Sequence, residues 1–322
     1  MQEVTVVIPN LNGEIYIRPC LDSLRKQTAG SFPILVIDNG SVDGSVKIIR
    51  EEYPEVTLVA LDKNYGFCRA VNEGIKRAET EFVLLLNNDI RADRDLVRCL
   101  RDAIAGRKNA FSVAAKMLSM QEPELIDDAG DLYCSLGWAF ALGKGKGREC
   151  YSRPAEIFAA CAGAAIYRRS VFEAIGYFDE NHFAYLEDVD IGYRARISGY
   201  GNYYAPEAVV YHAGSAVSGS RYNEFKVRLA SRNSVYLIYK NMPVWQILLN
   251  LPLLLAGIGI KALFFAGKGM GGTYIKGLRE GIRLSASEQG RVQKVRFRRE
   301  YAGNYLKIQR ELWLNTIRRF TG

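Results

Sequence analysis

The first half of the chain alternates short apolar runs with stretches of helical periodicity. The runs are rich in β-branched residues and end at proline or a polar residue, which is typical of buried strands. They cover residues 4–8, 34–37, 56–61 and 82–86. Predicted helices cover residues 14–27, 43–52 and 66–78, and another helix begins at Asp93. Apolar strands that alternate with helices predict a parallel sheet covered on both faces.

The pattern changes from about residue 110, where glycine and aromatic residues become more frequent. Here the sequence predicts strands at residues 159–167 and 208–211, short helices at residues 171–175 and 188–198, and a long helix at residues 222–240.

Polar residues follow three of the first-half strands. Asn10 follows the first strand, Asp38 ends the second and the triplet Asn87-Asn88-Asp89 follows the fourth. Ligands of parallel α/β sheets bind in the crevice beyond the carboxyl ends of the strands. The sequence therefore predicts a binding site at this edge of the sheet.

The most apolar stretch covers residues 244–260 and contains Gln246, Asn250 and Pro252. A spanning helix needs about 20 apolar residues, so we interpret this shorter stretch as an interfacial or re-entrant membrane segment. A core helix or an oligomer interface is the alternative. From Lys261 onward, fourteen Lys and Arg face four Glu, a net charge of +10, against +8 for the whole chain. This basic tail predicts contact with an anionic surface.

Composition narrows the class of protein. The 322 residues are 48% hydrophobic and 24% charged, which supports a sizeable core and excludes global disorder. The six cysteines are widely spaced without a C-x-x-C pair, so a zinc site or a disulfide-rich secreted scaffold is not indicated. The chain starts with an apolar strand rather than a signal sequence, and we expect a cytoplasmic protein.

Several motifs, taken together, resemble family 2 inverting glycosyltransferases with the GT-A fold. They are residues 4–10 (VTVVIPN) with Asn12, residues 36–41 (VIDNGS) with 43–45 (DGS), residues 64–67 (NYGF) with 72–74 (NEG), residues 84–89 (LLLNND), and residues 187–190 (EDVD) with Arg194. Residues 210–215 (VYHAGS) and the pair Arg232-Asn233 resemble a bacterial rhamnosyltransferase-like subgroup.

The resemblance implies an α/β fold of the Rossmann-like GT-A type, with a mostly parallel sheet flanked by helices. It places the catalytic domain at residues 1–220, with a nucleotide-binding half at about 1–110 and an acceptor-binding half at about 111–220. Residues 221–322 then form a helical, apolar and basic C-terminal region, which we expect to associate with the membrane.

The triplet after the fourth strand resembles the metal-binding Asp-x-Asp element of the family. It implies a divalent ion, Mg²⁺ or Mn²⁺, that neutralises the leaving diphosphate of a nucleoside diphosphate sugar. Asp89 is the first-choice ligand, Asn87 is a weaker neutral ligand and Asn88 belongs to the donor site. His212 is implied as a metal ligand or a diphosphate contact. A turn aspartate and a core histidine are the alternatives.

The nucleoside is expected at the first two strand ends. Asp38 would hydrogen-bond the base or ribose, by analogy with acids at strand ends in dinucleotide-binding folds, with a local turn as the alternative. Pro9 and Asn10 would shape the nucleobase pocket. Lys63 and Asn64 would contact ribose or diphosphate, and a surface turn is the alternative.

The acidic motif supplies the expected chemistry. By resemblance, Asp188 is the general base that takes the proton from the acceptor hydroxyl, and Glu187 contacts the acceptor or the donor sugar. Helix capping is the alternative for acids at a helix start. Asp190 and Arg194, four residues apart, predict a structural ion pair. Arg232 would pair with the diphosphate or the acceptor, and a solvated surface position is equally open.

The implied activity is transfer of a sugar to a hydroxyl of a glycan or lipid-linked acceptor at the inner face of the cell membrane. L-rhamnose from dTDP-rhamnose is expected from the subgroup alone. A nucleotidyltransferase is disfavoured, because residues 10–14 lack a cation. The acidic motif opposes a non-catalytic membrane-associated scaffold. Nucleic-acid binding by the tail has no motif to support it, and the oligomeric state stays open.

Overall fold

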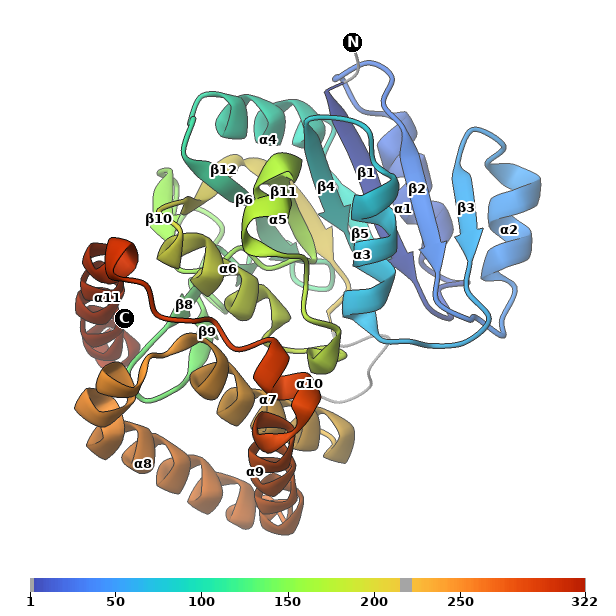
Figure 1. The fold of residues 1–322 in the computed structure, drawn as a ribbon. Helices are drawn as coiled ribbons and strands as arrows, with labels where there is room; N and C mark the ends of the chain where they lie inside the picture. The colour runs from blue at the N-terminus through green and yellow to red at the C-terminus, as the bar shows by residue number, and fades with distance from the viewer. Residues whose placement is uncertain (1–2, 215–221, 322) are drawn as a thin grey trace.

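The computed structural model describes residues 3–214 and 222–321 (Figure 1). Its first part alternates strands and helices, as the apolar pattern predicts. The elements are β1 (Val4–Asn10), α1 (Ile17–Arg25), β2 (Ile34–Asp38), α2 (Ser45–Glu52), β3 (Thr57–Ala60), α3 (Phe67–Arg77), β4 (Phe82–Leu86), β5 (Ile90–Ala92) and α4 (Leu96–Ala105).

The middle of the chain adds further strands and three helical segments. They are β6 (Ala110–Ser119), β7 (Ile126–Asp128), β8 (Asp131–Tyr133), β9 (Ala139–Ala141), β10 (Ala155–Ile157), β11 (Ala164–Arg168), α5 (Arg169–Ile175), the 3-10 helix η1 (Glu180–His182), α6 (Glu187–Ile197) and β12 (Gly201–His212).

The main sheet is mixed and has the order β10-β12-β6-β11-β4-β1-β2-β3. It is parallel from β4 to β3 and between β6 and β12, whereas β11 runs antiparallel to both of its neighbours. Alternate strand residues belong to two core clusters, one with Val6 and Val36 and the other with Val7 and Ile37. Helices cover both faces of the sheet (Figure 1), which explains why its central strands are apolar throughout.

Strand β12 is much longer than the predicted strand at residues 208–211. It starts at Gly201, and its pairing with β6 shifts register between Ala205 and Val209. Its early part contains Asn202, which is buried and donates hydrogen bonds to the carbonyls of Phe158 and Gly192. A buried polar residue with hydrogen-bond partners interrupts the apolar pattern, and for this reason the pattern did not predict the early part of β12.

The C-terminal region is helical, as predicted. It consists of α7 (Glu224–Asn241), α8 (Val244–Gly267), α9 (Gly271–Ala286), α10 (Glu288–Val292), the 3-10 helix η2 (Arg299–Tyr301) and α11 (Ala302–Thr321). The apolar helix α8 continues to Gly267, beyond the predicted end at residue 260. It is long and apolar enough to cross a membrane by length and composition, and little of it is buried. Length alone therefore does not decide its role.

These helices share a core with the middle of the chain. Leu237 of α7 and Tyr305 and Leu312 of α11 belong to the same buried cluster as Tyr133 of β8 and Tyr193 of α6. The predicted boundary at residues 220–221 lies within residues 215–221, outside the described part, and remains a prediction.

Candidate active site

Three predicted donor-site residues meet at the carboxyl ends of β1, β2 and β4. The amide of Asn88 donates a 2.7 Å hydrogen bond to Oδ1 of Asn10, whose own amide donates a 2.7 Å bond to Oδ1 of Asp38. Asn10 pairs with Asp38 in the parallel register, and all three residues are buried. Pro9 lies one residue before Asn10 on β1. The strand ends therefore form one connected polar floor.

Asp38 also makes the local turn that was its alternative interpretation. Its carboxylate accepts hydrogen bonds from the hydroxyl of Ser41 at 2.5 Å and from the backbone N–H of Ser41 at 3.0 Å. Asp38 is only 2% exposed, and its role on the nucleoside remains a prediction.

The loop after β3 is organised by Asn64. Its side-chain oxygen accepts hydrogen bonds from the amide of Asn39 at 3.0 Å and from the backbone N–H of Gly66 at 2.9 Å. Asn64 thus forms the turn that we considered as its alternative. The neighbouring Lys63 is exposed, with its ammonium 5.0 Å from the centre of the Tyr65 ring. Of these two residues, Lys63 is charged and exposed, so its ammonium group is accessible to a ligand.

Asp89 and His212 lie side by side although 123 positions separate them. Antiparallel pairing of β12 with β5 sets His212 opposite Ile90, and His212 Nε2 lies 3.6 Å from Asp89 Oδ2. His212 Nδ1 forms a 2.7 Å hydrogen bond with Asp127 Oδ2. Asp127 precedes Asp128, the last residue of β7, and was not predicted as a site residue. A carboxylate that holds the second nitrogen of a histidine orients the ring for ligation.

Charge at this corner is balanced within the group. Burial lowers the pKa of His212, but the hydrogen bond to Asp127 and the charge of Asp89 outweigh this effect, and the pKa is raised. Burial raises the pKa of Asp89, and the charge of His212 offsets it in part. The pKa of Asp127 is lowered to about 2, because its bonds to His212 and Lys144 outweigh burial. The corner therefore offers a cation the charge of Asp89 and, once His212 is deprotonated, a ring nitrogen.

Asp89 and His212 fit a single divalent ion. Adjacent ligands on an octahedral ion with bonds of about 2.1 Å lie roughly 3.0 Å apart, close to the observed 3.6 Å. Asn87, two residues before Asp89, has room at Gly163, where a Cβ would lie 3.1 Å from the Asn87 amide nitrogen. Asp89 and His212 are thus brought together as predicted, and Asn87 lies on the same loop.

The acidic motif opens helix α6, with Glu187 and Asp190 buried and Asp188 partly buried. The residue before it, Leu186, has a left-handed backbone, and Asp188 Oδ1 accepts a 2.7 Å hydrogen bond from the backbone N–H of Val189. Burial raises the pKa of Asp188 to about 6, and burial with the neighbouring charge of Asp188 raises the pKa of Glu187 to about 8. Glu187 Oε2 is buried without a hydrogen-bond partner among the described residues. These carboxyl groups are tuned to exchange protons near neutral pH.

A second acidic segment, which the sequence did not flag, faces Asp188. Asp131 of β8 lies within hydrogen-bond reach of Asp188, and burial with the charges of Asp128 and Asp188 raises the pKa of Asp131 well above its usual range. Asp131 is therefore the more readily protonated of the two carboxyls, and its protonated form would donate a hydrogen bond to the Asp188 carboxylate. Ligand atoms of Asp128, Asp131 and Cys161 lie within 4.8 Å of one another. The signal in the sequence was the density of acids in residues 126–131 (IDDAGD).

The sequence profile of glycosyl transferase family 2 matches residues 5–176, more than half of the chain. The chain belongs to glycosyltransferase family 2.

Individual relatives agree with this assignment. The chain is 28% identical over 219 residues to the N-acetylglucosaminyl-diphospho-decaprenol L-rhamnosyltransferase of Mycobacterium tuberculosis, covering 60% of this chain and 70% of the relative. It is 25% identical over 206 residues to the low-salt glycan biosynthesis hexosyltransferase Agl10 of Haloferax volcanii, covering 61% and 62% of the two chains. Our chain is thus similar to a rhamnosyltransferase and to another sugar transferase.

Solved structures show the same fold. GalNAc-T7, in a crystal structure with UDP, GalNAc and Mn²⁺, aligns with a TM-score of 0.60 at 16% identity, over 74% of this chain and 48% of that chain. Our glycosyltransferase therefore spans about half of GalNAc-T7. Staphylococcus aureus TarS 1–349 in complex with UDP-GlcNAc aligns with a TM-score of 0.56 at 19% identity, over 97% and 89% of the two chains. These likenesses confirm the GT-A fold.

In this glycosyltransferase the segment before the acidic motif is held in a strained conformation. Phe183, Tyr185 and Leu186 all have positive φ angles, between 63° and 70°, which cost energy in residues other than glycine. The buried amide of Asn233 donates hydrogen bonds to the carbonyls of three residues in this segment at 2.8–3.0 Å; they are His182, Ala184 and Tyr185. Asn233 thus fixes the backbone that leads into the acidic motif.

Arg232 of the glycosyltransferase supports the same segment. Its guanidinium donates to the carbonyls of Asn181 at 2.7 Å and His182 at 2.8 Å, and to the side-chain oxygen of Asn233 at 2.9 Å. The solvated position that was its alternative does not describe it, since Arg232 is only partly exposed. A role on diphosphate or acceptor remains a prediction.

The predicted ion pair of Asp190 and Arg194 is present. Arg194 donates two hydrogen bonds to Asp190 Oδ2, at 3.0 and 2.9 Å. Lys240 of α7 reaches the same oxygen at 2.9 Å and also binds Asp179 at 2.8 Å. Burial lowers the pKa of His182, which lies beside Asp190, to about 4, so this histidine is neutral. The network links α6 to α7, and we interpret its role as structural.

Proposed function

We propose that this glycosyltransferase is an inverting enzyme that moves a sugar from a nucleoside diphosphate sugar to an acceptor hydroxyl, with Asp188 as general base. One observation carries the proposal: β7 ends in two consecutive acids that join the two halves of the site. Asp127 binds His212 beside Asp89, and the next residue, Asp128, lies close enough to Asp188 for their charges to interact. The residues proposed for the leaving group and those proposed for the acceptor are thus linked through adjacent positions of one strand.

The Asp188 carboxylate accepts the proton of the acceptor hydroxyl as that oxygen bonds to the anomeric carbon. The bond from this carbon to the diphosphate oxygen breaks at the same time, and the nucleoside diphosphate leaves with the electron pair. Attack opposite to the leaving group inverts the anomeric configuration. A base with a pKa of about 6 is mostly ionised at neutral pH and still takes the proton effectively. Protonated Glu187 is a hydrogen-bond donor to a sugar hydroxyl.

Asp89 and His212 would hold the divalent metal, with Asn87 as a neutral third ligand. Mg²⁺ or Mn²⁺ bound here supplies positive charge that stabilises the leaving diphosphate. Asp127 keeps the His212 ring oriented, with Nε2 directed toward Asp89. Because His212 binds metal only in its deprotonated form, acid weakens metal binding.

The donor lies along the polar floor of the sheet. The nucleoside contacts Pro9, Asn10 and Asp38, and the diphosphate lies toward Asn88. Lys63, Asn64 and Arg232 line the remaining edge of the donor site. The donor is dTDP-L-rhamnose, a choice supported by the similarity to the mycobacterial L-rhamnosyltransferase.

The acceptor is a glycan intermediate, and a lipid-linked one is favoured. The name of the mycobacterial relative specifies a diphospho-decaprenol acceptor, and an apolar helix with a basic tail suits work at the inner face of the cell membrane. The glycosyltransferase is therefore a cytoplasmic protein that binds the membrane peripherally.

Release of nucleoside diphosphate tests the reaction. The purified protein is incubated with Mn²⁺ or Mg²⁺, a panel of sugar nucleotides that includes dTDP-rhamnose, UDP-GlcNAc and GDP-mannose, and a polyprenyl-diphosphate-linked GlcNAc acceptor. We expect nucleoside diphosphate with one donor and a product of inverted anomeric configuration by NMR. The proposal fails if no donor yields nucleoside diphosphate, or if the product retains the donor's configuration.

A further inference from the structure

Helix α8 buries polar side chains and exposes apolar ones, which is the reverse of an ordinary surface helix. Its buried residues Gln246, Asn250, Leu254 and Gly257 form one stripe at helical spacing, and the two amides in it are 0% exposed. The opposite side exposes large apolar residues, and it includes Leu248 (63% exposed), Leu255 (60%) and Leu263 (77%). We call these three residues the docking face. A helix facing water would place its leucines inside and its amides outside.

The inward amides fasten α8 to the catalytic part of the protein. The hydroxyl of Tyr193 on α6 donates a 2.7 Å hydrogen bond to Gln246. Asn250 and Gln309 of α11 exchange two amide hydrogen bonds, at 2.8 and 2.9 Å. The amide groups of Gln246 and Asn250 are therefore hydrogen-bonded inside the protein. The exception is Gln246 Nε2, for which the described residues provide no partner.

The fastening continues past the middle of α8. The indole N–H of Trp138 donates a 3.1 Å hydrogen bond to the carbonyl of Gly257. A Cβ on Gly257 would lie 2.2 Å from the carbonyl oxygen of Leu136, so only glycine permits this close approach. Crossing a bilayer would pull these groups away from their partners and place unpaired amides in hydrocarbon, which is costly. The contacts therefore keep α8 flat against the protein, with one side free.

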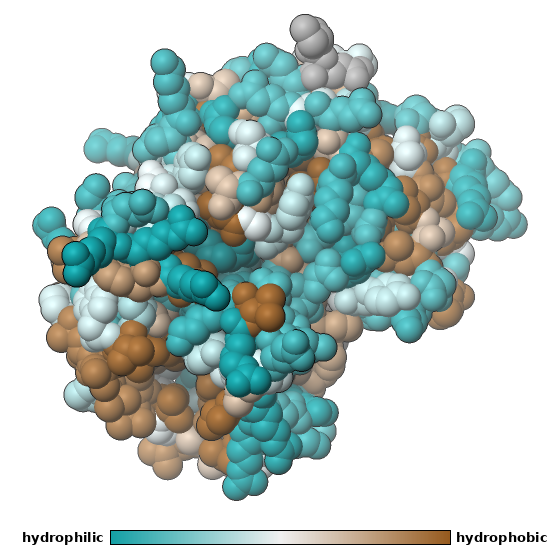
Figure 2. All heavy atoms as spheres, viewed as in Figure 1, coloured by the Kyte–Doolittle hydropathy of each residue, from teal (hydrophilic) through white to brown (hydrophobic). Residues whose placement is uncertain are grey.

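The free side forms a continuous apolar surface. Figure 2 shows the hydrophobic colour gathered over α8 at the lower left of the molecule, whereas the neighbouring α9 is largely hydrophilic on the same view. Contiguous apolar patches on soluble proteins mark sites that another apolar phase covers.

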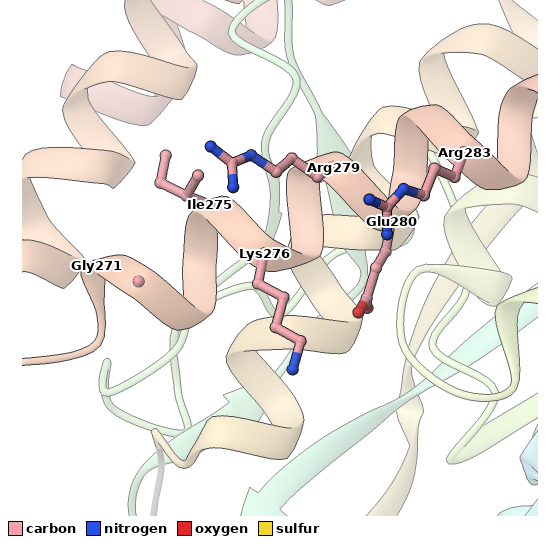
Figure 3. Close-up of a pocket in the computed structure, with 7 residues that line it drawn as sticks. Gly271, Ile275, Lys276, Arg279, Glu280 and Arg283 are labelled. Atoms are coloured by element: carbon pink, nitrogen blue, oxygen red, sulfur yellow. The ribbon is translucent and has the colours of Figure 1, made fainter.

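Helix α9 adds positive charge beside this surface. A shallow groove of about 470 Å³ runs along α9 and is lined by Lys276, Arg279, Glu280 and Arg283, among others (Figure 3). The one carboxylate, Glu280, accepts three hydrogen bonds from Arg228 of α7 and is therefore already neutralised. Three cations are left to attract an anion. This charge favours a lipid surface over a second copy of the chain, which would bring the same positive charge to the contact.

We propose that α8 lies parallel to an anionic phospholipid bilayer, with the docking face inserted at the level of the headgroups and upper acyl chains, and that Lys276, Arg279 and Arg283 contact lipid phosphates. The binding mode follows from the reversed polarity of α8 together with its fastening along one side. The inference deepens the proposed function, since a bound lipid surface is where a lipid-linked acceptor resides, but the measurement of vesicle binding needs neither donor nor acceptor.

Vesicle flotation of the full-length protein tests the surface. We expect the protein to float with phosphatidylcholine vesicles that contain phosphatidylglycerol, and less with phosphatidylcholine alone. The double variant Leu255→Glu/Leu263→Glu should bind at least about tenfold more weakly, because charges would enter the apolar zone. The triple variant Lys276→Glu/Arg279→Glu/Arg283→Glu should lose the preference for phosphatidylglycerol.

The matched control is Val292→Glu, since Val292 of α10 is an apolar residue that is 75% exposed. It follows the end of α9 that is remote from α8, and α9 is a 16-residue helix of about 24 Å. This variant should bind vesicles like the unchanged protein. Circular dichroism melting of each variant verifies folding, and nucleoside diphosphate release verifies the site, so a defect in binding is separable from a defect in catalysis. Unchanged flotation of the double variant overturns the proposal. The proposal is also overturned if light scattering shows that the unchanged protein is a dimer and that the double variant is a monomer, because the docking face would then be a dimer interface.

Depth distinguishes a flat helix from a spanning one. Tryptophan is placed singly at Leu248, Leu255 and Leu263, and its fluorescence is quenched with lipids brominated at different depths. A flat helix gives the same shallow depth at all three positions. A depth that changes steadily along α8 would show a spanning helix and overturn the binding mode.

Discussion

The carboxyls of Asp188 and Asp131 form a pair in which the pKa of Asp131 is raised well above its usual range and the pKa of Asp188 is raised to about 6. This arrangement has a direct consequence for the pH dependence of transfer. The pKa of Asp188 is raised to about 6, so the carboxylate becomes protonated below that pH and loses its capacity to act as a base. We expect kcat/KM to fall about tenfold per pH unit below pH 6.

The partner can be tested separately. Asp131→Ala removes the donor that stabilises ionised Asp188, and the acid limb of the profile should move to higher pH. Asp131→Asn keeps a donor of the same shape, and its limb should stay near that of the unchanged enzyme. An equal shift in both variants would argue against the shared hydrogen bond.

The metal corner makes a second prediction at this scale. Asp89 carries charge and faces His212, whereas Asn87 contributes only a neutral oxygen. Asp89→Ala should reduce kcat/KM by about 100-fold or more and raise the Mn²⁺ concentration needed for half-maximal activity. Asn87→Ala should cost about tenfold or less. Mn²⁺ titrations of both variants measure this, and equal losses would show that Asn87 is as important a ligand as Asp89.

At the scale of elements, α7 holds the approach to α6 through the side chains of Asn233 and Arg232. Asn233→Ala would remove the donor that three carbonyls of residues 182–185 share, of which the His182 carbonyl keeps its hydrogen bond from Arg232. The strained segment would then relax and misplace Asp188, and a displacement of about 1 Å costs about 100-fold in rate. We expect kcat to fall by 10- to 100-fold, with little change in the donor KM.

Ser234→Ala provides the control for this prediction. Ser234 lies next to Asn233, and among the described residues its hydroxyl bonds only within α7, to the carbonyl of Ser231. Steady-state kinetics of both variants, with melting curves, separate positioning from stability. A fall in the melting temperature of Asn233→Ala that fully accounts for its lost activity would contradict the positioning role.

The elements also show what the sequence could predict. Strands β1, β2 and β4 were evident because they are buried on both faces and therefore apolar throughout. Strands β6 and β12 were missed or shortened, because buried polar residues such as Asn202 find their partners only in the folded chain. Asp89 and Asp188 stood out by motif. Asp127 and Asp131 did not, because their roles depend on the pairing of β12 with β5 and on the contact of β8 with α6.

On the scale of the whole molecule, the catalytic part and the C-terminal helices depend on each other. Tyr305, Ile308 and Leu312 of α11 are almost fully buried in the cluster that contains Tyr193. Each large side chain contributes roughly 1.5–3 kcal/mol on burial, so the three together approach the 5–15 kcal/mol that stabilises a typical domain.

Deletion of residues 302–322 should therefore abolish cooperative unfolding or leave the protein insoluble. Deletion of residues 321–322 alone, at the exposed end of α11, is the control and should leave the melting temperature unchanged. Differential scanning calorimetry of both proteins measures the effect. A cooperative, active fragment that lacks α11 would show that the catalytic part folds independently.

The reversed polarity of α8 changes how the enzyme would meet its substrates. An enzyme lying flat on a bilayer searches for a lipid-linked acceptor by lateral diffusion in two dimensions. Its turnover would then follow the number of acceptor molecules per unit area of membrane, and diluting the acceptor with inert lipid would slow transfer even when its bulk concentration stays constant. The soluble sugar nucleotide would reach the enzyme by diffusion from bulk solution, so the rate would depend on its bulk concentration and not on the area of membrane.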